Sequence, residues 1–183
     1  MESGWATEQV AALLELRDSG QRNLELLSPR LVTPPEASQR LREAAPAIWF
    51  PAARSPEGAL AGLWLYFGAF QEAHEIVQDL ETPEGSYWHA IIHRLEPDTW
   101  NSGYWFRRVG RHPIFPALLE KAVETVATDP DCGFVPGGRW SPERFTAFCE
   151  VARDRPDSRA EHVAREIQSS EWRLLFAWCG MRR

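Results

Sequence analysis

Residues 82–96 read TPEGSYWHAIIHRLE, and this stretch combines a helix start with a helical pattern of apolar residues. Thr82 can cap the free N–H groups of a first turn, and Pro83 suits the first helical position because it has no N–H to leave unpaired. Glu84 meets the positive end of the helix dipole. Apolar side chains follow at the spacing of one helical face, at Trp88, Ile91, Ile92 and Leu95. The stretch therefore predicts an amphipathic helix.

The start signal recurs elsewhere in the chain, as TPPE at 33–36, SPE at 55–57 and SPE at 141–143. No segment alternates apolar and polar residues in the way that predicts a half-buried strand. A length of 183 residues suits one domain with its own core. We therefore predict an all-α protein in which antiparallel helical hairpins pack as one compact domain over residues 1–183. Its helices are predicted at 8–19, 34–45, 56–67, 70–80, 83–96, 101–111, 114–127, 142–153 and 159–178.

Two stretches between these helices are predicted to be irregular. Residues 46–55 (PAIWFPAARS) are bounded by prolines and predict a linker. Residues 128–141 (TDPDCGFVPGGRWS) are rich in glycine and proline, and they predict a loop that could cover a cleft.

The composition narrows the classes of partner and compartment. A formal net charge of −6 argues against nucleic acid or an anionic membrane surface as the main partner. Three cysteines without a CxxC pair fit a reducing compartment and argue against a thiolate zinc site. The N-terminus has no apolar signal segment, and the longest apolar run, 59–70, is too short to span a bilayer. We therefore expect a soluble, cytoplasmic protein without a membrane span.

The central stretch, SYWHAIIHRLEPDTWNSGYWFRRVGRHP at 86–113, resembles a set of bacterial and fungal proteins. Those proteins share an SYWHxxxHRxExDxxNxxYWFRRxGxHP signature, and the likeness extends loosely to IQSSEWRLLF at 167–176. The resemblance implies no particular activity. It therefore leaves the chemistry of the site to the residues themselves.

A weak internal repeat lies in the same region, where 68–83 is echoed by 98–113. In each copy an aromatic residue in the turn, Phe70 or Trp100, precedes a small residue by three positions. Aromatic residues that plug turns between close-packed helices are typical of helical hairpins. The pattern resembles the tetratricopeptide repeat over 58–115, although the unit here is shorter.

A second stripe on the helix at 83–96 is polar and consists of Ser86, His89, His93 and Glu96. The 3.6-residue period rotates this stripe about a third of a turn from the apolar one, so it borders the buried face. We expect it to lie in a groove between helices. Polar groups in such a groove are partly desolvated and need partners.

One hypothesis for this stripe is a divalent metal site in a metal-dependent enzyme. His89 and His93 are four residues apart, and Glu96 follows at the next turn, so all three can meet one ion. His74 or His112 could complete the ligand set. The structural alternative is that the two histidines hydrogen-bond Glu96, Tyr104 or a backbone carbonyl and so orient neighbouring helices.

The leading hypothesis is a pocket for a small, anionic ligand. Arginine recognises carboxylate or phosphate, and Trp or Tyr faces hold a ring. In an enzyme, His89 or His93 would be the catalytic base, and an arginine would stabilise developing negative charge. A helical-repeat adaptor that binds a protein segment is the remaining alternative. The candidate ligand-binding residues are Trp88, Asn101, Tyr104, Trp105, Arg107, Arg108 and His112.

Overall fold

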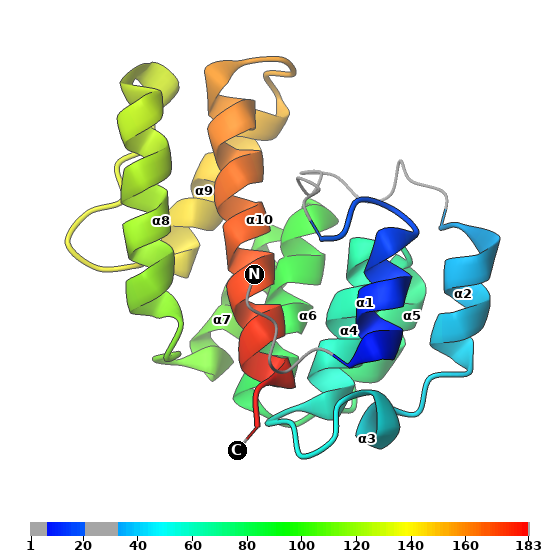
Figure 1. Ribbon diagram of the computed structural model, residues 1–183. Helices are drawn as coiled ribbons and strands as arrows, with labels where there is room; N and C mark the ends of the chain where they lie inside the picture. The colour runs from blue at the N-terminus through cyan, green and yellow to red at the C-terminus, as the bar shows by residue number, and fades with distance from the viewer. Residues whose placement is uncertain (1–6, 21–32, 183) are drawn as a thin grey trace.

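The computed structural model describes residues 7–20 and 33–182, and Figure 1 shows their arrangement. Within these two ranges the chain forms helices, and the one extended pairing is an isolated β-bridge between Ala53 and Arg182. The all-α prediction is therefore confirmed. The helices are α1 (Glu8–Glu15), α2 (Pro35–Arg42), α3 (Pro46–Trp49), α4 (Pro56–Tyr66), α5 (Phe70–Val77), α6 (Pro83–Leu95), α7 (Thr99–Val109), α8 (Phe115–Thr128), the 3₁₀ turn η1 (Pro130–Cys132), α9 (Pro142–Arg153) and α10 (Arg159–Gly180).

The domain predicted over 1–183 includes residues 1–6, 21–32 and 183, which lie outside the described residues. No helix in the described ranges is long and apolar enough to cross a membrane.

Two of the predicted helix caps form as the sequence pattern indicates. The Thr82 hydroxyl accepts a hydrogen bond from the Gly85 N–H at 3.0 Å at the start of α6. The Ser141 hydroxyl accepts one from the Arg144 N–H at 3.2 Å at the start of α9. Each bond satisfies an N–H group that has no partner within its own helix.

The other two predicted caps do not form, and each of these residues makes a tertiary contact. The Thr33 hydroxyl donates to the Phe67 carbonyl at 3.1 Å, and α2 begins two residues later at Pro35. Ser55 makes no capping bond with its side chain, while its N–H donates to the Cys179 carbonyl at 3.0 Å. Both segments are thus tied to helix ends that are distant in the sequence.

The predicted linker at 46–55 is partly wrong, because its first four residues form the one-turn helix α3. Pro46 occupies the first helical position, where its missing N–H costs nothing. The Phe50 side chain that follows is 1% exposed and belongs to the core. The Arg54 N–H donates to the Met181 carbonyl at 2.8 Å, so the segment is fixed against the end of α10.

Two apolar clusters form the interior, and α10 runs along both of them (Figure 1). Its first half contributes Val163 and Ile167 to the cluster shared with α8 and α9. Its second half contributes Trp172 and Leu175 to the larger cluster shared with α1 to α7. The Trp172 indole N–H donates to the Gly62 carbonyl at 2.8 Å and so joins α10 to α4. α10 therefore connects the two halves of the fold.

Neighbouring helices pack in pairs, most extensively α4 with α5 and α6 with α7. The Ser102 hydroxyl of α7 donates to the Ala90 carbonyl of α6 at 2.9 Å. One detail of the predicted repeat is wrong: Trp100 is 73% exposed and does not plug a turn. It lies in the first turn of α7 and stacks on Tyr104 instead. The resemblance to the tetratricopeptide repeat stays a prediction.

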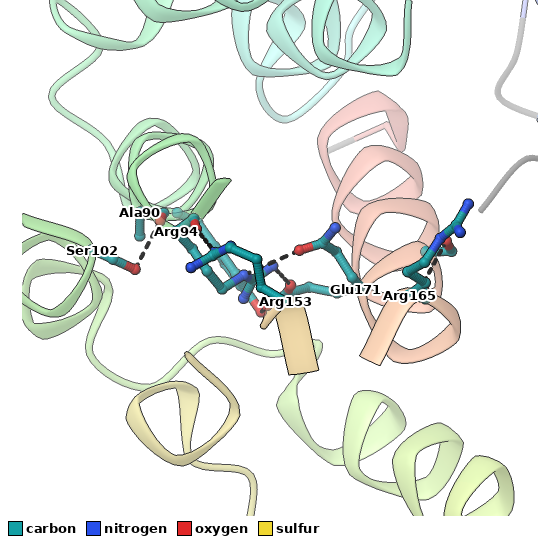
Figure 2. A network of polar contacts seen from close by, with 9 residues as sticks. Ala90, Arg94, Ser102, Arg153, Arg165 and Glu171 are labelled. Atoms are coloured by element: carbon teal, nitrogen blue, oxygen red, sulfur yellow. Dashed lines mark hydrogen bonds and ion pairs between the residues drawn. The ribbon is translucent and has the colours of Figure 1, made fainter. Parts of the chain in front are cut away.

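A buried ion pair lies where the two clusters meet. Arg94 of α6 is 0% exposed, and its Nη2 donates to Glu171 Oε2 of α10. The Tyr87 hydroxyl donates to the other carboxylate oxygen at 3.0 Å, and Arg94 Nε donates to Gln168 Oε1 at 3.3 Å. Arg153 of α9 donates to the Arg94 carbonyl at 2.6 Å, and Figure 2 shows the Arg153 side chain directed toward Arg94. The network joins α6, α9 and α10 and neutralises the buried charge.

Candidate functional site

Three histidines from two neighbouring helices form one cluster. His74 comes from α5, and His89 and His93 come from successive turns of α6. The short connection at 78–82 returns the chain beside α5, which brings His74 against the histidine face of α6. Each residue offers a ring nitrogen, and these three atoms all lie within 4.8 Å of one another. We call these residues the histidine cluster.

The rings are ordered by stacking with an aromatic residue of α7. His89 lies between Trp105 and His93, with ring centroids 3.9 Å and 4.9 Å away and planes nearly parallel. His74 meets His89 edge-on at 4.6 Å and His93 edge-on at 5.7 Å. Because Trp105 covers one face of His89, the cluster is shielded from solvent on that side.

Burial lowers the pKa of the two α6 histidines of the cluster. His89 is 5% exposed, and burial, followed by the neighbouring His74 and His93 rings, lowers its pKa to about 4. Burial also lowers the pKa of His93, although Glu96 and Asp98 act in the opposite direction. A neutral imidazole keeps one unprotonated nitrogen, which can accept a proton or bind a metal ion. The His89 Nδ1 is buried and makes no hydrogen bond with any described residue.

Two carboxylates lie close to the Nδ1 of His93. Its Nδ1 lies 3.3 Å from Glu96 Oε2 and 4.0 Å from Asp98 Oδ2, within ion-pair range but outside hydrogen-bond geometry. Glu96 therefore lies beside His93 Nδ1 and is not among the three residues whose ligand atoms lie within 4.8 Å of one another. Asp98, which the sequence patterns did not single out, also caps α7 by accepting from the Asn101 N–H at 3.0 Å.

The predicted pocket residues of α7 spread around the helix. Trp105 covers His89, and the Arg108 guanidinium lies over the Trp105 ring, 5.4 Å from its centroid. Arg107 is exposed, and two residues at the helical period set it about 200° around α7 from Trp105. The histidine face therefore has Arg108 near its aromatic wall, while Arg107 lies on the opposite side of α7.

The other predicted ligand-binding residues have structural contacts. Trp88 is 0% exposed and packs against the α4 backbone, where a side chain at Gly62 would collide with it. Asn101 is engaged in the cap with Asp98, and its side-chain amide also donates to the carboxylate at 2.6 Å. Tyr104 is 39% exposed.

His112 lies apart from the histidine cluster. Its ring is 5.1 Å from Tyr87 and 5.6 Å from Trp178, on another side of α6. Burial lowers the pKa of His112 to about 4, although Glu84 acts in the opposite direction. Of the two histidines expected to join His89 and His93, the structure therefore brings only His74 to them.

A cavity of about 540 Å³ lies beside His112, between the α7–α8 turn and residues 138–143. We call it the α7–α8 cavity. Residues 138–141 belong to the Gly/Pro loop predicted at 128–141, and they form one wall. Trp140, which the sequence patterns did not mark as a pocket residue, belongs to the same wall.

No protein-family model, curated protein or solved structure matches this chain.

Proposed function

We propose that the protein binds a transition-metal ion of the zinc class through His74, His89 and His93. One observation carries the proposal: three imidazoles offer ring nitrogens within 4.8 Å of one another. Imidazole is a ligand that suits zinc, copper and nickel, whereas magnesium and calcium prefer oxygen ligands. A nitrogen-only cluster therefore favours a zinc-class ion over an alkaline-earth ion.

The protonation state of the cluster supports the proposal. A metal ion binds only the unprotonated nitrogen of histidine, so a ring that is already neutral loses no proton on binding. Burial and the other two rings lower the pKa of His89 to about 4. His89 is therefore ready to bind an ion at neutral pH.

The geometry needs a small adjustment. Zinc–nitrogen distances of about 2.0–2.1 Å in a tetrahedron set ligand nitrogens about 3.3 Å apart, so the widest pair must approach by about 1.5 Å. Rotation of the His74 and His93 side chains can supply this movement, because both are only partly buried. Trp105 would hold His89 in place while the other two rings close on the ion.

Glu96 and Asp98 fit the second shell of such a site. Histidine ligands commonly donate their other N–H to a carboxylate, which fixes the ring and raises its basicity. Glu96 is 3.3 Å from the His93 Nδ1, so the Nε2 of this ring is the nitrogen left for the metal. This assigns Glu96 to orienting His93 and makes a direct ligand role unnecessary.

The number of ligands favours a reactive site over a structural one. Structural zinc sites have four protein ligands and usually include cysteine, whereas catalytic sites have three protein ligands and a water. Three histidines leave a fourth position for water, whose pKa a zinc ion lowers towards 7. Metal-assisted hydrolysis is therefore the class of reaction to assay once metal binding is established.

Equilibrium dialysis against Zn²⁺, followed by elemental analysis, tests the proposal. We expect one zinc per chain for the wild-type protein, and loss of that zinc in His74→Ala, His89→Ala and His93→Ala. His162→Ala is the matched control, because His162 is exposed on α10 and its ion-pair partner among the described residues is Glu166, at 3.5 Å. Equal zinc retention in all four variants, or no zinc in the wild-type protein, would refute the proposal.

A further inference from the structure

The α7–α8 cavity has the size and the apolar lining of a small-molecule site. Its volume of about 540 Å³ lies within the range of about 300–1,000 Å³ that such pockets occupy. Phe106, Phe115, Leu119 and Trp140 supply apolar wall. Three of these four side chains are aromatic, so the cavity suits a flat ring.

The charged groups at the cavity are mainly basic. Arg111 and Arg139 both line it and are exposed, and neither makes an ion pair or hydrogen bond within the described residues. One carboxylate, that of Glu143, also lines the cavity, and it accepts a hydrogen bond from the Ser141 hydroxyl at 3.1 Å. Two arginines against one glutamate leave a net positive charge.

Two residues that line the cavity carry ring N–H groups without an acceptor among the described residues. The His112 Nδ1 accepts from the Ile114 N–H at 3.4 Å, which puts the proton of the neutral ring on Nε2. The His112 Nε2 and the Trp140 Nε1 are both buried without a hydrogen-bond partner among the described residues. Buried donors are rarely left unpaired in native proteins, but both N–H groups are closed off from solvent, so they do not define the site of the carboxylate.

We propose that the α7–α8 cavity binds a small aromatic carboxylate. The ring of the ligand lies against the aromatic wall, and its carboxylate accepts from the Arg111 and Arg139 guanidinium groups at the mouth. A single guanidinium binds a planar carboxylate through two parallel N–H groups, so each of these unengaged arginines offers a carboxylate site. This inference does not depend on the histidine cluster, which lies on another side of α6.

Calorimetric titration with naphthalene carboxylate and its neutral carboxamide, both in the presence of a metal chelator, tests the inference. We expect one-to-one binding of the carboxylate, more tightly than the carboxamide. Arg111→Gln and Arg139→Gln should each weaken carboxylate binding about 5- to 10-fold and leave carboxamide binding unchanged. Glu143→Gln should strengthen carboxylate binding, because it removes the opposing charge.

Arg107→Gln is the control, since Arg107 is an exposed arginine of α7 outside the cavity. Circular dichroism checks that each variant is folded. The inference is overturned if both compounds bind equally, if neither binds at about 1 mM, or if Arg107→Gln weakens binding as much as Arg111→Gln does. Because the chelator removes zinc, failure here is separate from failure of the metal proposal.

Discussion

His93 and Arg94 are consecutive residues of α6, and their side chains enter opposite surroundings. Arg94 is fully buried and bonded to Glu171 and Gln168, and its guanidinium carbon lies 4.8 Å from the centroid of the Phe145 ring. His93 faces two other histidines, and its Nδ1 lies 3.3 Å from the Glu96 carboxylate.

The two regions differ in whether their buried polar groups already have hydrogen-bond or charge partners within the protein. The charge of Arg94 is matched inside the protein, so removing one partner would leave an uncompensated ion in the core. The histidine cluster instead holds buried ring nitrogens, His89 Nδ1 and His93 Nδ1, that make no hydrogen bond with the described residues. We infer that the Arg94 network holds the scaffold and that the histidine cluster is kept open for a ligand.

The largest expected effect comes from breaking the ion pair. Glu171→Gln should lower the free energy of unfolding by about 3–5 kcal/mol, because Arg94 would stay charged and buried without its counter-ion. Urea unfolding followed by circular dichroism measures this loss. Glu166→Gln, on a half-exposed part of the same helix, is the control and should cost less than about 1 kcal/mol. A similarly small loss in Glu171→Gln would contradict the scaffold role.

Zinc should stabilise the wild-type protein but not a variant of the cluster. At a free zinc concentration 100 times the dissociation constant, binding adds about 2.7 kcal/mol. The melting temperature should then rise by roughly 5–10 °C for a chain of this size. His93→Ala should lose this rise, and His162→Ala should keep it. A rise of the same size in both variants would show that zinc binds elsewhere.

Acid should weaken the fold through His112. The folded-state pKa of about 4 lies below the ordinary value of 6.5, so stability is fully present above 6.5 and is lost as pH falls towards 4. At about pH 5 the free energy of unfolding should be lower by about 2 kcal/mol, because each pH unit below 6.5 costs about 1.4 kcal/mol. Urea unfolding at about pH 7.5 and 5 with chelator present should show a smaller loss for His112→Asn. Equal losses in the two proteins would argue against a neutral, buried His112.

The smallest effect is expected from His93→Ala without metal. Because the His93 Nδ1 makes no hydrogen bond of good geometry, its removal should cost only about 1 kcal/mol. Urea unfolding in chelator measures this cost. A loss of about 3 kcal/mol or more would instead favour the structural alternative, in which the histidines orient the helices.

Helices with strong local signals could be predicted from the sequence. The segment predicted at 142–153 coincides with α9 (Pro142–Arg153), and that predicted at 83–96 differs from α6 by one residue. The helix α3 was missed because one turn is too short to show a hydrophobic period. The cap predicted at Thr33 did not form because a tertiary contact uses its hydroxyl.

The candidate site could be predicted only where local geometry decides it. A four-residue spacing is enough to put His89 and His93 on one face, and a short connection made His74 their neighbour. The partner of Arg94 lies 77 residues further along the chain, and no local pattern indicates such a pairing. The side of α7 that meets His89 was likewise decided by packing, which selected Trp105 and left Arg107 outside.

Anomalous diffraction at the zinc absorption edge, from crystals grown with Zn²⁺, tests the metal proposal most directly. We predict one strong peak about 2.0–2.1 Å from ring nitrogens of His74, His89 and His93. We also predict that the Glu96 carboxylate remains beside the His93 Nδ1 in that crystal. Strong zinc peaks at other places, with the three rings unchanged and no density between them, would contradict the proposal.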